Sequence, residues 1–473
     1  MARVLMVASE AAPFAKTGGL ADVVGALSAA LRARGQEVAV ALPRYRSVAL
    51  EGAERVHEHL SIWLAAGAFF DADIWRTAHR EVPYFFIDCP PLYDRAGIYG
   101  EAADYPDNHV RFAVLCQAAL ALVRYHWRPD VLHCHDWQTA LLPVYIRTRL
   151  AGDPTFMGLR TLLTLHNLGY QGIYPKTVLP EIGLDESLFH PDALEFFGEV
   201  NLLKGGIRFA DALNAVSPTY AREIQTPELG FGLDGVLRAR GDALTGILNG
   251  ADYEEWNPEA DPHLPARYSA ADLSGKRVVK QELLAEMGLP AEALARPLVG
   301  MVSRLDSQKG FDLLQEAAAE LAAEDLSLVA LVTGAPRWEG FLRAWAAAHP
   351  EKIAIRVAYD EGLAHRVIAG ADLLLVPSRY EPCGLTQIYA LRYGTVPVVR
   401  ATGGLADTVD EATGFSFREY TVAALLEALR RALAAYREPD GWRERMRLGM
   451  ARDFSWNASA ARYSELYRSL AEP

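Results

Sequence analysis

The sequence predicts an α/β protein of two domains, each built on a parallel sheet with helices on both faces. At 473 residues the chain is longer than a single hydrophobic core usually serves. Hydrophobic residues make up 51% and charged residues 23%, which is typical of a well-packed globular protein. Short apolar runs alternate with longer amphipathic segments. This alternation is typical of βαβ units, whose two helix layers make each domain doubly wound.

The predicted strands are apolar runs that fall into two series along the chain. Those of the first half are Arg3–Ala8, Glu37–Leu42, Pro83–Ile87, Asp130–His133, Thr161–His166 and Leu213–Val216. Those of the second half are Leu298–Val302, Leu328–Thr333, Ile353–Ala358, Asp372–Val376 and Val396–Val399. A helix is predicted after the first strand because apolar residues recur on one face and Gly35 provides a stop.

The two series are separated by a stretch dense in Gly, Pro, Asn and Asp, and the domain junction is predicted near Gly246–Pro258. The first domain is then expected over residues 1–245 and the second over residues 246–455. Residues 456–473 remain as a separate C-terminal segment.

Charge and cysteine usage exclude several classes of partner and compartment. A formal net charge of −13 disfavours nucleic acid and anionic lipid as partners. The four cysteines are scattered without CxxC spacing, which indicates a reducing compartment and argues against a disulfide scaffold or a thiolate metal site. The first apolar run is too short for a signal-peptide core, and no run reaches membrane-spanning length. A cytoplasmic protein without membrane partners is expected.

The hexapeptide TGGLAD occurs twice, at Thr17–Asp22 and at Thr402–Asp407, each time after a predicted strand. Ligands of open α/β sheets bind beyond the carboxyl ends of the strands, so both turns are candidate binding elements. The backbone N–H groups of Gly18 and Gly19, with Lys16 alongside, suit an anionic oxygen. Neither turn fits the dinucleotide or Walker A pattern, which argues against a nicotinamide dehydrogenase or a P-loop enzyme. The alternative is a glycine pair that only eases helix packing.

Two charged clusters of the second half also follow predicted strands. Arg304 and Lys309 are five positions apart in a loop that precedes a helix, where they suit a diphosphate. Glu381 precedes the helix start Gly384–Thr386, so its carboxylate suits sugar hydroxyls and the helix N–H groups suit a phosphate. The alternatives are solvated loop charges and a carboxylate that balances the helix dipole. Cys383 is interpreted as a packing residue.

The segments DVLHCHDWQTALLP and LLTLHNLGYQG carry further polar residues of the first half that are candidates for ligand binding. His133 and His135 share one face of a predicted strand, so a metal site completed by Asp136 or His166 is one alternative. No further ligand has confirming spacing, and no metal site is expected. The other interpretation is a polar strand end that hydrogen-bonds a polyhydroxy ligand, with Trp137 as an apolar surface.

Seven segments resemble bacterial glycogen synthases and the similar plant starch synthases in their order along nearly the whole chain. They are KTGGLADVVGALSAAL, HCHDWQTALLP, TLHNLGYQG, ILNGADYEEWNP, SRLDSQKGFDLL, YEPCGLTQIYAL and ATGGLADTV. The resemblance implies transfer of glucose from ADP-glucose to the 4-hydroxyl of an α-1,4-glucan, with retention of configuration. It also implies the GT-B fold, with two Rossmann-like domains, an active site in the cleft between them, and neither a metal ion nor another cofactor. The first domain would be the acceptor side, the second the donor side, and the C-terminal helix would cross back to the first.

The resemblance assigns roles to individual residues. Lys16 and Gly18 would approach the donor, and Arg304 and Lys309 would neutralise its diphosphate together with the N–H groups of Leu385 and Thr386. Glu381 would bind the glucose hydroxyls, and His166 would lie beside C6 and the anomeric centre. Asp136 and Asn249 would line the sugar and acceptor side, Tyr359 would stack on adenine, and Tyr99 would contact the donor. The further substrate-binding residues are Gly19, Asp22, Asn167, Cys383 and Gly384. The catalytic set is Lys16, His166, Arg304, Lys309 and Glu381.

One position departs from the wider retaining GT-B class, where many members carry a second glutamate that here is Tyr389. No carboxylate in the matching segments is an obvious covalent nucleophile, which favours front-face attack by the glucan hydroxyl with the leaving phosphate as base. Two alternatives remain open: a transferase of the sucrose or trehalose synthase type with a small acceptor, and a non-catalytic glucan-binding protein. A homo-oligomeric state is also left open.

Overall fold

A computed structural model describes residues 2–64, 67 and 69–472 of the chain. The chain divides into two units. Unit 1 comprises Met1–Val216, Ala221–Gly250 and Trp456–Pro473, and unit 2 comprises Ser217–Tyr220 and Ala251–Ser455. Every predicted strand is found in the structure, with bounds that differ by a few residues at most.

The main sheet of unit 1 has the strand order β12-β11-β7-β6-β1-β2-β5-β4-β3. Its parallel strands are β1 (Val4–Val7), β2 (Val38–Pro43), β5 (Val82–Asp88), β6 (Val131–His135), β7 (Arg160–Leu165), β11 (Ala212–Ala215) and β12 (Leu244–Gly246). The chain moves from β1 to β2 in one direction and returns to β6 on the other side of β1. The topological switch point, where ligands bind in doubly wound sheets, therefore lies between β1 and β6.

The expectation of purely parallel sheets is wrong at one edge of unit 1. Strands β3 (Glu54–Trp63) and β4 (Phe69–His79) form an antiparallel hairpin, and β4 also pairs antiparallel with β5. Polar and apolar residues alternate in this hairpin, because one face is solvated, so it lacks the continuous apolar runs that identify buried strands. A second, three-stranded antiparallel sheet of β8 (Ile173–Tyr174), β10 (Glu199–Asn201) and β9 (Glu195–Phe196) was also not predicted.

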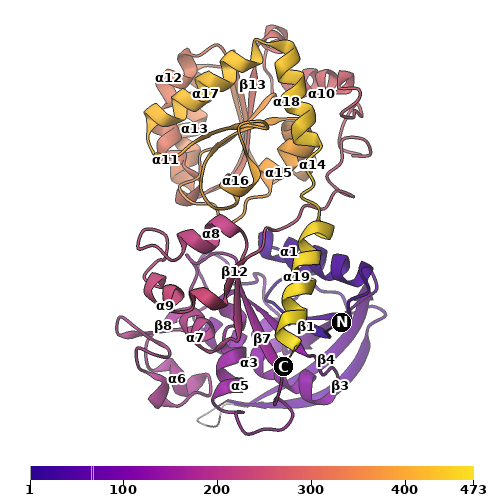
Figure 1. Cartoon of the computed structure of the whole chain (residues 1–473), viewed down its shortest axis with the longest axis vertical. Helices are drawn as coiled ribbons and strands as arrows, with labels where there is room; N and C mark the ends of the chain where they lie inside the picture. The colour runs from indigo at the N-terminus through magenta and orange to yellow at the C-terminus, as the bar shows by residue number, and fades with distance from the viewer. Residues whose placement is uncertain (1, 65–66, 68, 473) are drawn as a thin grey trace. The chain divides into compact units, whose positions relative to one another are not determined.

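The helices of unit 1 include the C-terminal one, α19 (Trp456–Ala471), which packs on α1 (Gly19–Ala33) (Figure 1). Tyr463 and Tyr467 of α19 lie 2.8 Å by their hydroxyls from Asn214 Nδ2 and His133 Nδ1 respectively. The other helices are α2 (Pro90–Tyr93), α3 (Asn108–Tyr125), α4 (Asp136–Thr139), α5 (Leu141–Arg147), α6 (Val178–Glu181), α7 (Leu202–Phe209) and α9 (Asp234–Ala239). The short helix α8 (Pro218–Glu223) contains the point where the chain passes from one unit to the other.

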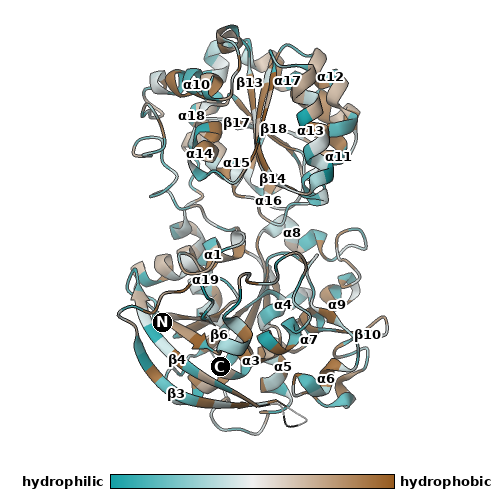
Figure 2. Ribbon diagram, turned by 180° about the vertical axis from the view of Figure 1, so that it is seen from behind, coloured by the Kyte–Doolittle hydropathy of each residue, from teal (hydrophilic) through white to brown (hydrophobic). Residues whose placement is uncertain are grey.

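Unit 2 is built on a six-stranded parallel sheet with the order β15-β14-β13-β16-β17-β18. Its strands are β13 (Leu298–Leu305), β14 (Ser327–Gly334), β15 (Ile353–Val357), β16 (Leu373–Val376), β17 (Val396–Arg400) and β18 (Phe415–Phe417). The strands are strongly hydrophobic, as Figure 2 shows, because helices cover both faces of the sheet. The switch point of this unit lies between β13 and β16.

The helices of unit 2 form its two outer layers. They are α10 (Ser274–Glu286), α11 (Phe311–Glu316), α12 (Ala318–Ala323), α13 (Pro336–Ala348), α14 (Glu361–Gly370), α15 (Thr386–Arg392), α16 (Gly403–Thr408), α17 (Val422–Tyr436) and α18 (Pro439–Met450). In the part of the chain that the structure describes, no helix combines the length and the apolar character needed to cross a membrane. The prediction of two doubly wound α/β domains is confirmed.

Candidate functional site

The loops after β13, β16 and β17 meet at the carboxyl edge of the unit 2 sheet, beside its switch point. The backbone N–H of Arg379 donates to the carbonyl of Gln308 at 2.8 Å. The side-chain amide of Gln308 donates to the carbonyl of Tyr380 at 3.2 Å. These bonds join the loop that carries Arg304 and Lys309 to the loop that carries Glu381.

Glu381 and Lys309 form an ion pair at this edge. Glu381 is 6% exposed, and its Oε2 accepts hydrogen bonds from Lys309 Nζ at 2.7 Å and from Ser378 Oγ at 2.9 Å. Arg304, at the end of β13, is exposed, and its guanidinium has no ion pair with any described residue. The structure thus holds one cation against a carboxylate and presents a second to solvent. This arrangement suits a ligand that carries both hydroxyls and negative charge.

The second TGGLAD turn packs directly against the Glu381 loop. Gly403 has a φ of +46°, a region that favours glycine, and a Cβ built there would lie 1.8 Å from the carbonyl oxygen of Glu381. The N–H of Gly404 donates to that same oxygen at 3.1 Å. The glycine pair therefore fixes the position of Glu381 by letting two backbone segments approach closely.

The helix start predicted at Gly384–Thr386 is present as the first turn of α15. Its cap residue is Leu385, and no side chain caps the helix. Cys383 is buried and forms no disulfide, and burial suits a packing role. Tyr359 is 80% exposed in the segment between β15 and α14, so its ring faces solvent. Tyr389, one turn into α15, stacks on Trp256 with ring centroids 4.0 Å apart.

In unit 1 the first TGGLAD turn is held by Glu10, a residue that sequence reasoning missed. Glu10 is 3% exposed and accepts hydrogen bonds from the N–H groups of Thr17 and Gly18, the latter at 3.3 Å. The hydroxyl of Tyr99 donates to the other carboxylate oxygen of Glu10 at 2.5 Å. Lys16 Nζ and Asp22 Oδ1 form an ion pair at 2.7 Å. The structure thus gathers Lys16, Gly18, Gly19, Asp22 and Tyr99 at the carboxyl end of β1.

A chain of polar residues lies at the carboxyl ends of β6, which is next to β1, and of β7, which is next to β6. His135 Nδ1 and His166 Nε2 share a hydrogen bond at 2.9 Å, and Asp136 Oδ1 accepts the N–H of His166 at 2.7 Å. Asp136 has a φ of +55°, which is strained for a residue with a side chain and is typical of functional sites. The sequence placed His135 only in the metal alternative and not among the substrate-binding residues, although it lies one residue before Asp136 at the strand end.

Burial shifts the pKa values of the buried histidines and of Asp136 so that the neutral form of each group is favoured. Burial lowers the pKa of His166 to about 3, and that of His133 also to about 3. Burial raises the pKa of Asp136 to about 7, although amide hydrogen bonds from His166 and Asn167 oppose it. At neutral pH both histidines are therefore uncharged, and Asp136 titrates close to the working pH.

The metal alternative at His133 and His135 does not fit the geometry. Both ring nitrogens of His133 have protein partners, Tyr467 at 2.8 Å and Thr164 at 2.7 Å, so neither is available to a cation. The expectation of Trp137 as an apolar surface is wrong, because its ring is 8% exposed and packs on Phe112. Asn249, beyond β12, is buried, and its Oδ1 has no hydrogen-bond partner among the described residues.

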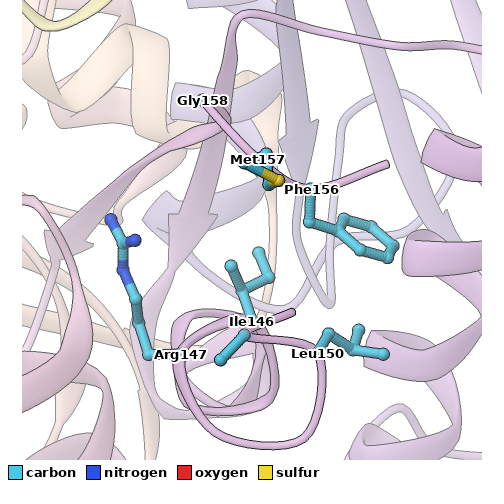
Figure 3. Close-up of a pocket in the computed structure, with 7 residues that line it drawn as sticks. Ile146, Arg147, Leu150, Phe156, Met157 and Gly158 are labelled. Carbon is cyan, nitrogen blue, oxygen red and sulfur yellow. The ribbon is translucent and has the colours of Figure 1, made fainter. Parts of the chain in front are cut away.

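A separate hollow of about 230 Å³ lies on unit 1 beside α5. Its apolar lining comes from Ile146, Leu150, Phe156 and Met157, and the guanidinium of Arg147 extends along one side (Figure 3). None of the predicted site residues lines it. Each unit thus has its own group of strand-end candidate residues, and this hollow belongs to neither group.

Two family models match the chain. Residues 3–239 match "Starch synthase catalytic domain", and residues 290–448 match "Glycosyl transferases group 1". A glycogen synthase of Anaeromyxobacter sp. (strain Fw109-5) is 51% identical over 99% of this chain and 100% of its own length. A glycogen synthase of Koribacter versatilis is 46% identical over 98% of this chain and 97% of its own length.

Solved structures of similar fold were also found. The catalytic domain of starch synthase IV from Arabidopsis thaliana, bound to ADP and acarbose, is 34% identical and superposes with a TM-score of 0.91 over 100% of both chains. Sucrose-phosphate synthase from Thermosynechococcus elongatus is 19% identical, with a TM-score of 0.63 over 99% of this chain and 98% of its own, a likeness of fold alone.

Proposed function

The chain belongs to the glycogen and starch synthase family of glycosyltransferases with the GT-B fold, and we propose that it extends an α-1,4-glucan with glucose from ADP-glucose, retaining the anomeric configuration. One observation carries the proposal in this molecule. The cations Arg304 and Lys309 and the carboxylate Glu381 converge at the switch point of unit 2, on the loops that would receive a nucleotide sugar.

The donor is assigned to unit 2 by charge. Arg304 offers a planar fork and Lys309 a point charge to the diphosphate, and the N–H groups of Leu385 and Thr386 add neutral donors. Exposed Tyr359 offers a ring face to adenine. The Arabidopsis relative is bound to ADP in its solved structure, which supports a nucleoside diphosphate as the ligand.

The chemistry follows from where charge develops during transfer. The bond between C1 and the β-phosphate oxygen breaks, leaving positive charge on the sugar and negative charge on ADP. Arg304, Lys309 and the N–H groups stabilise the second charge, which is stronger in the transition state than in the ground state. The glucan 4-hydroxyl attacks C1 on the same face, and its proton passes to the departing phosphate oxygen.

The residues of unit 1 would complete the reaction at the sugar. His166 is neutral because burial lowers its pKa to about 3, so it can orient the glucose without repelling the cationic centre. Asp136, with its pKa raised by burial to about 7, and Asn249 would line the sugar and acceptor side. Lys16 and Gly18, held by Glu10, would approach the same donor from unit 1.

We also propose that the reaction needs no metal ion and takes place in the cytoplasm. Charge neutralisation by Arg304, Lys309 and Lys16 supplies the role that a divalent cation has in many phosphate sites. All four cysteines, Cys89, Cys116, Cys134 and Cys383, are buried and none forms a disulfide, which is compatible with a reducing compartment.

The proposal is tested by incubating the protein with ADP-glucose or UDP-glucose and with glycogen or fructose, and measuring nucleotide release. We expect ADP release that depends on glycogen, with labelled glucose incorporated into the polymer. Release that depends on fructose would instead identify a transferase for small acceptors. Glycogen binding without release of nucleotide would identify a non-catalytic glucan-binding protein.

A further inference from the structure

A cluster of metal-ligand side chains in unit 2 contains none of the predicted site residues. Across residues 2–64, 67 and 69–472, one group of histidine, cysteine or carboxylate side chains brings three ligand atoms within 4.8 Å of one another: Glu255, Glu361 and His365. Glu361 and His365 are four positions apart on α14, so they share one face of the helix. Glu255 belongs to the segment before α10 and reaches the same place from another part of the chain.

His365 has a ring nitrogen prepared for a ligand. The side chain is 1% exposed, and its Nδ1 lies 2.8 Å from Asp261 Oδ2. Asp261 also accepts hydrogen bonds from the Tyr393 hydroxyl at 2.5 Å and from the His263 N–H at 2.8 Å. A carboxylate that accepts all three bonds requires His365 to carry its proton on Nδ1, which leaves the lone pair on Nε2.

That Nε2 atom is buried and has no hydrogen-bond partner in the described structure. Leaving a buried polar atom unpaired costs free energy, and native structures rarely do so without a reason. At metal centres a ligating histidine usually donates its other ring N–H to a carboxylate, as His365 Nδ1 does to Asp261. Because Nδ1 is engaged in this way, Nε2 is the nitrogen that remains for a ligand shared with Glu255 and Glu361.

Stacked aromatic rings hold the cluster in place. Trp256 lies between His365, with ring centroids 3.7 Å apart and planes 12° apart, and Tyr389, with 4.0 Å and 3°. Because Glu255 directly precedes Trp256, this stack fixes the backbone that carries Glu255 beside α14. The cluster is thus built on packed groups, although Glu255 and Glu361 themselves are exposed.

We propose that Glu255, Glu361 and His365 bind a divalent zinc ion. One imidazole nitrogen with two carboxylate oxygens suits Zn²⁺, and three protein ligands leave a fourth position for water. The ion joins the segment of Glu255 to the first turns of α14 and stabilises unit 2. It takes no part in glycosyl transfer, and it is distinct from the His133 and His135 arrangement, whose geometry does not fit a cation.

The test measures zinc binding to the full chain after EDTA treatment and desalting. We expect one saturable site by calorimetry, and a rise in Tm of about 5 °C at a zinc concentration about 100-fold above Kd. Glu255→Gln and Glu361→Gln keep the shape of the exposed side chains but remove the anionic ligand, so each should weaken binding at least about tenfold. Glu282→Gln, an exposed glutamate of α10 outside the cluster, is the matched control and should bind as the wild type does.

Four outcomes would overturn the site. Zinc binding that is unchanged in both glutamine variants would place the ion elsewhere, and no saturable zinc binding in the wild type would remove it. An equal rise in Tm with Mg²⁺ would indicate an oxygen-only site without His365, since Mg²⁺ prefers oxygen ligands. Crystals soaked in zinc should show an anomalous peak about 2.0–2.1 Å from His365 Nε2, and the lack of a peak there would also overturn it.

Discussion

The two copies of TGGLAD have the same six residues and different surroundings. In unit 1, Gly18 has an extended φ of −159°, and a Cβ built on it meets no described atom within 4 Å. In unit 2, Gly403 has a φ of +46°, and a Cβ on it would lie 1.8 Å from the Glu381 carbonyl. The fold of unit 2 therefore requires its glycine, whereas the fold of unit 1 does not.

The aspartates that end the two turns, Asp22 and Asp407, also have different partners. Asp22 forms an ion pair with Lys16 at 2.7 Å. Asp407 accepts hydrogen bonds from Thr219, at 2.8 Å from the backbone N–H and 2.6 Å from the hydroxyl. One turn thus orients a cation, and the other anchors the segment Ser217–Tyr220 of unit 2. The same six residues therefore follow β1 in one sheet and β17 in the other, and they have different partners in the two places.

Donor binding is proposed for unit 2, and the largest expected effect concerns Arg304 and Lys309. Replacing either with Ala should lower kcat by about 10²–10³, the loss that follows removal of one donor to a developing anion. Arg343→Ala, an exposed arginine of α13, is the matched control and should leave kcat unchanged. Activity of the Arg304 and Lys309 variants within a few-fold of wild type would contradict the assignment.

A smaller effect is expected at Tyr359, the exposed ring of the same unit. The wild type should prefer ADP-glucose to UDP-glucose in kcat/KM, because the purine offers the larger stacking face. Stacking of a base on an aromatic ring is worth about 1–3 kcal/mol, so Tyr359→Ala should narrow this preference by roughly tenfold. Equal kcat/KM for the two donors in the wild type would refute the role of the ring.

The pKa shifts of unit 1 predict a dependence of Tm on pH. His166 has its folded pKa lowered to about 3, so its contribution to stability is complete above pH 6.5 and is lost as pH falls toward 3. Asp136 has its folded pKa raised to about 7, so its contribution is present below pH 3.8 and is lost as pH rises through 7.

Thermal melts of two variants separate these contributions. When pH falls from 7.5 to 5, the Tm of His166→Gln should drop roughly 3 °C less than the Tm of the wild type. When pH rises from 6 to 8, the Tm of Asp136→Asn should drop less than the Tm of the wild type. Slopes identical to wild type in both variants would show that neither group changes its pKa on folding.

Removal of metal should have the smallest effect on the reaction. After EDTA and desalting, the rate of transfer at a temperature well below Tm should equal that of untreated protein. The zinc ion proposed at Glu255, Glu361 and His365 stabilises unit 2, so its removal should lower Tm and leave the rate unchanged. A rate that falls with EDTA and returns with a divalent cation would contradict metal-independent transfer.

The sequence predicted the parallel strands of both sheets because burial on both faces leaves continuous apolar runs, as in Leu298–Val302. It missed the β3–β4 hairpin, whose solvated face breaks such runs, and it missed Glu10 and Ser378. Both residues lie just after a strand, but only the folded chain shows that Glu10 binds Gly18 and that Ser378 binds Glu381. Because the two turns have identical sequences, the sequence could not show that Gly403 has a positive φ while Gly18, at the same place in the other turn, does not.

The central claim is that unit 2 binds the nucleotide, and that the first TGGLAD turn, in unit 1, is needed for turnover but not for nucleotide binding. Titration of ADP by calorimetry into Gly18→Val and Gly403→Val tests it most directly, with a thermal melt of each variant. Gly18→Val should keep wild-type ADP affinity and Tm, because a Cβ built at Gly18 meets no described atom within 4 Å. It should lose turnover, because the added side chain would enter the space proposed for the donor. Gly403→Val should have weaker ADP affinity, lower turnover and a lower Tm, because its side chain would displace the Glu381 loop. If Gly18→Val loses as much ADP affinity as Gly403→Val, the division between the two units is wrong.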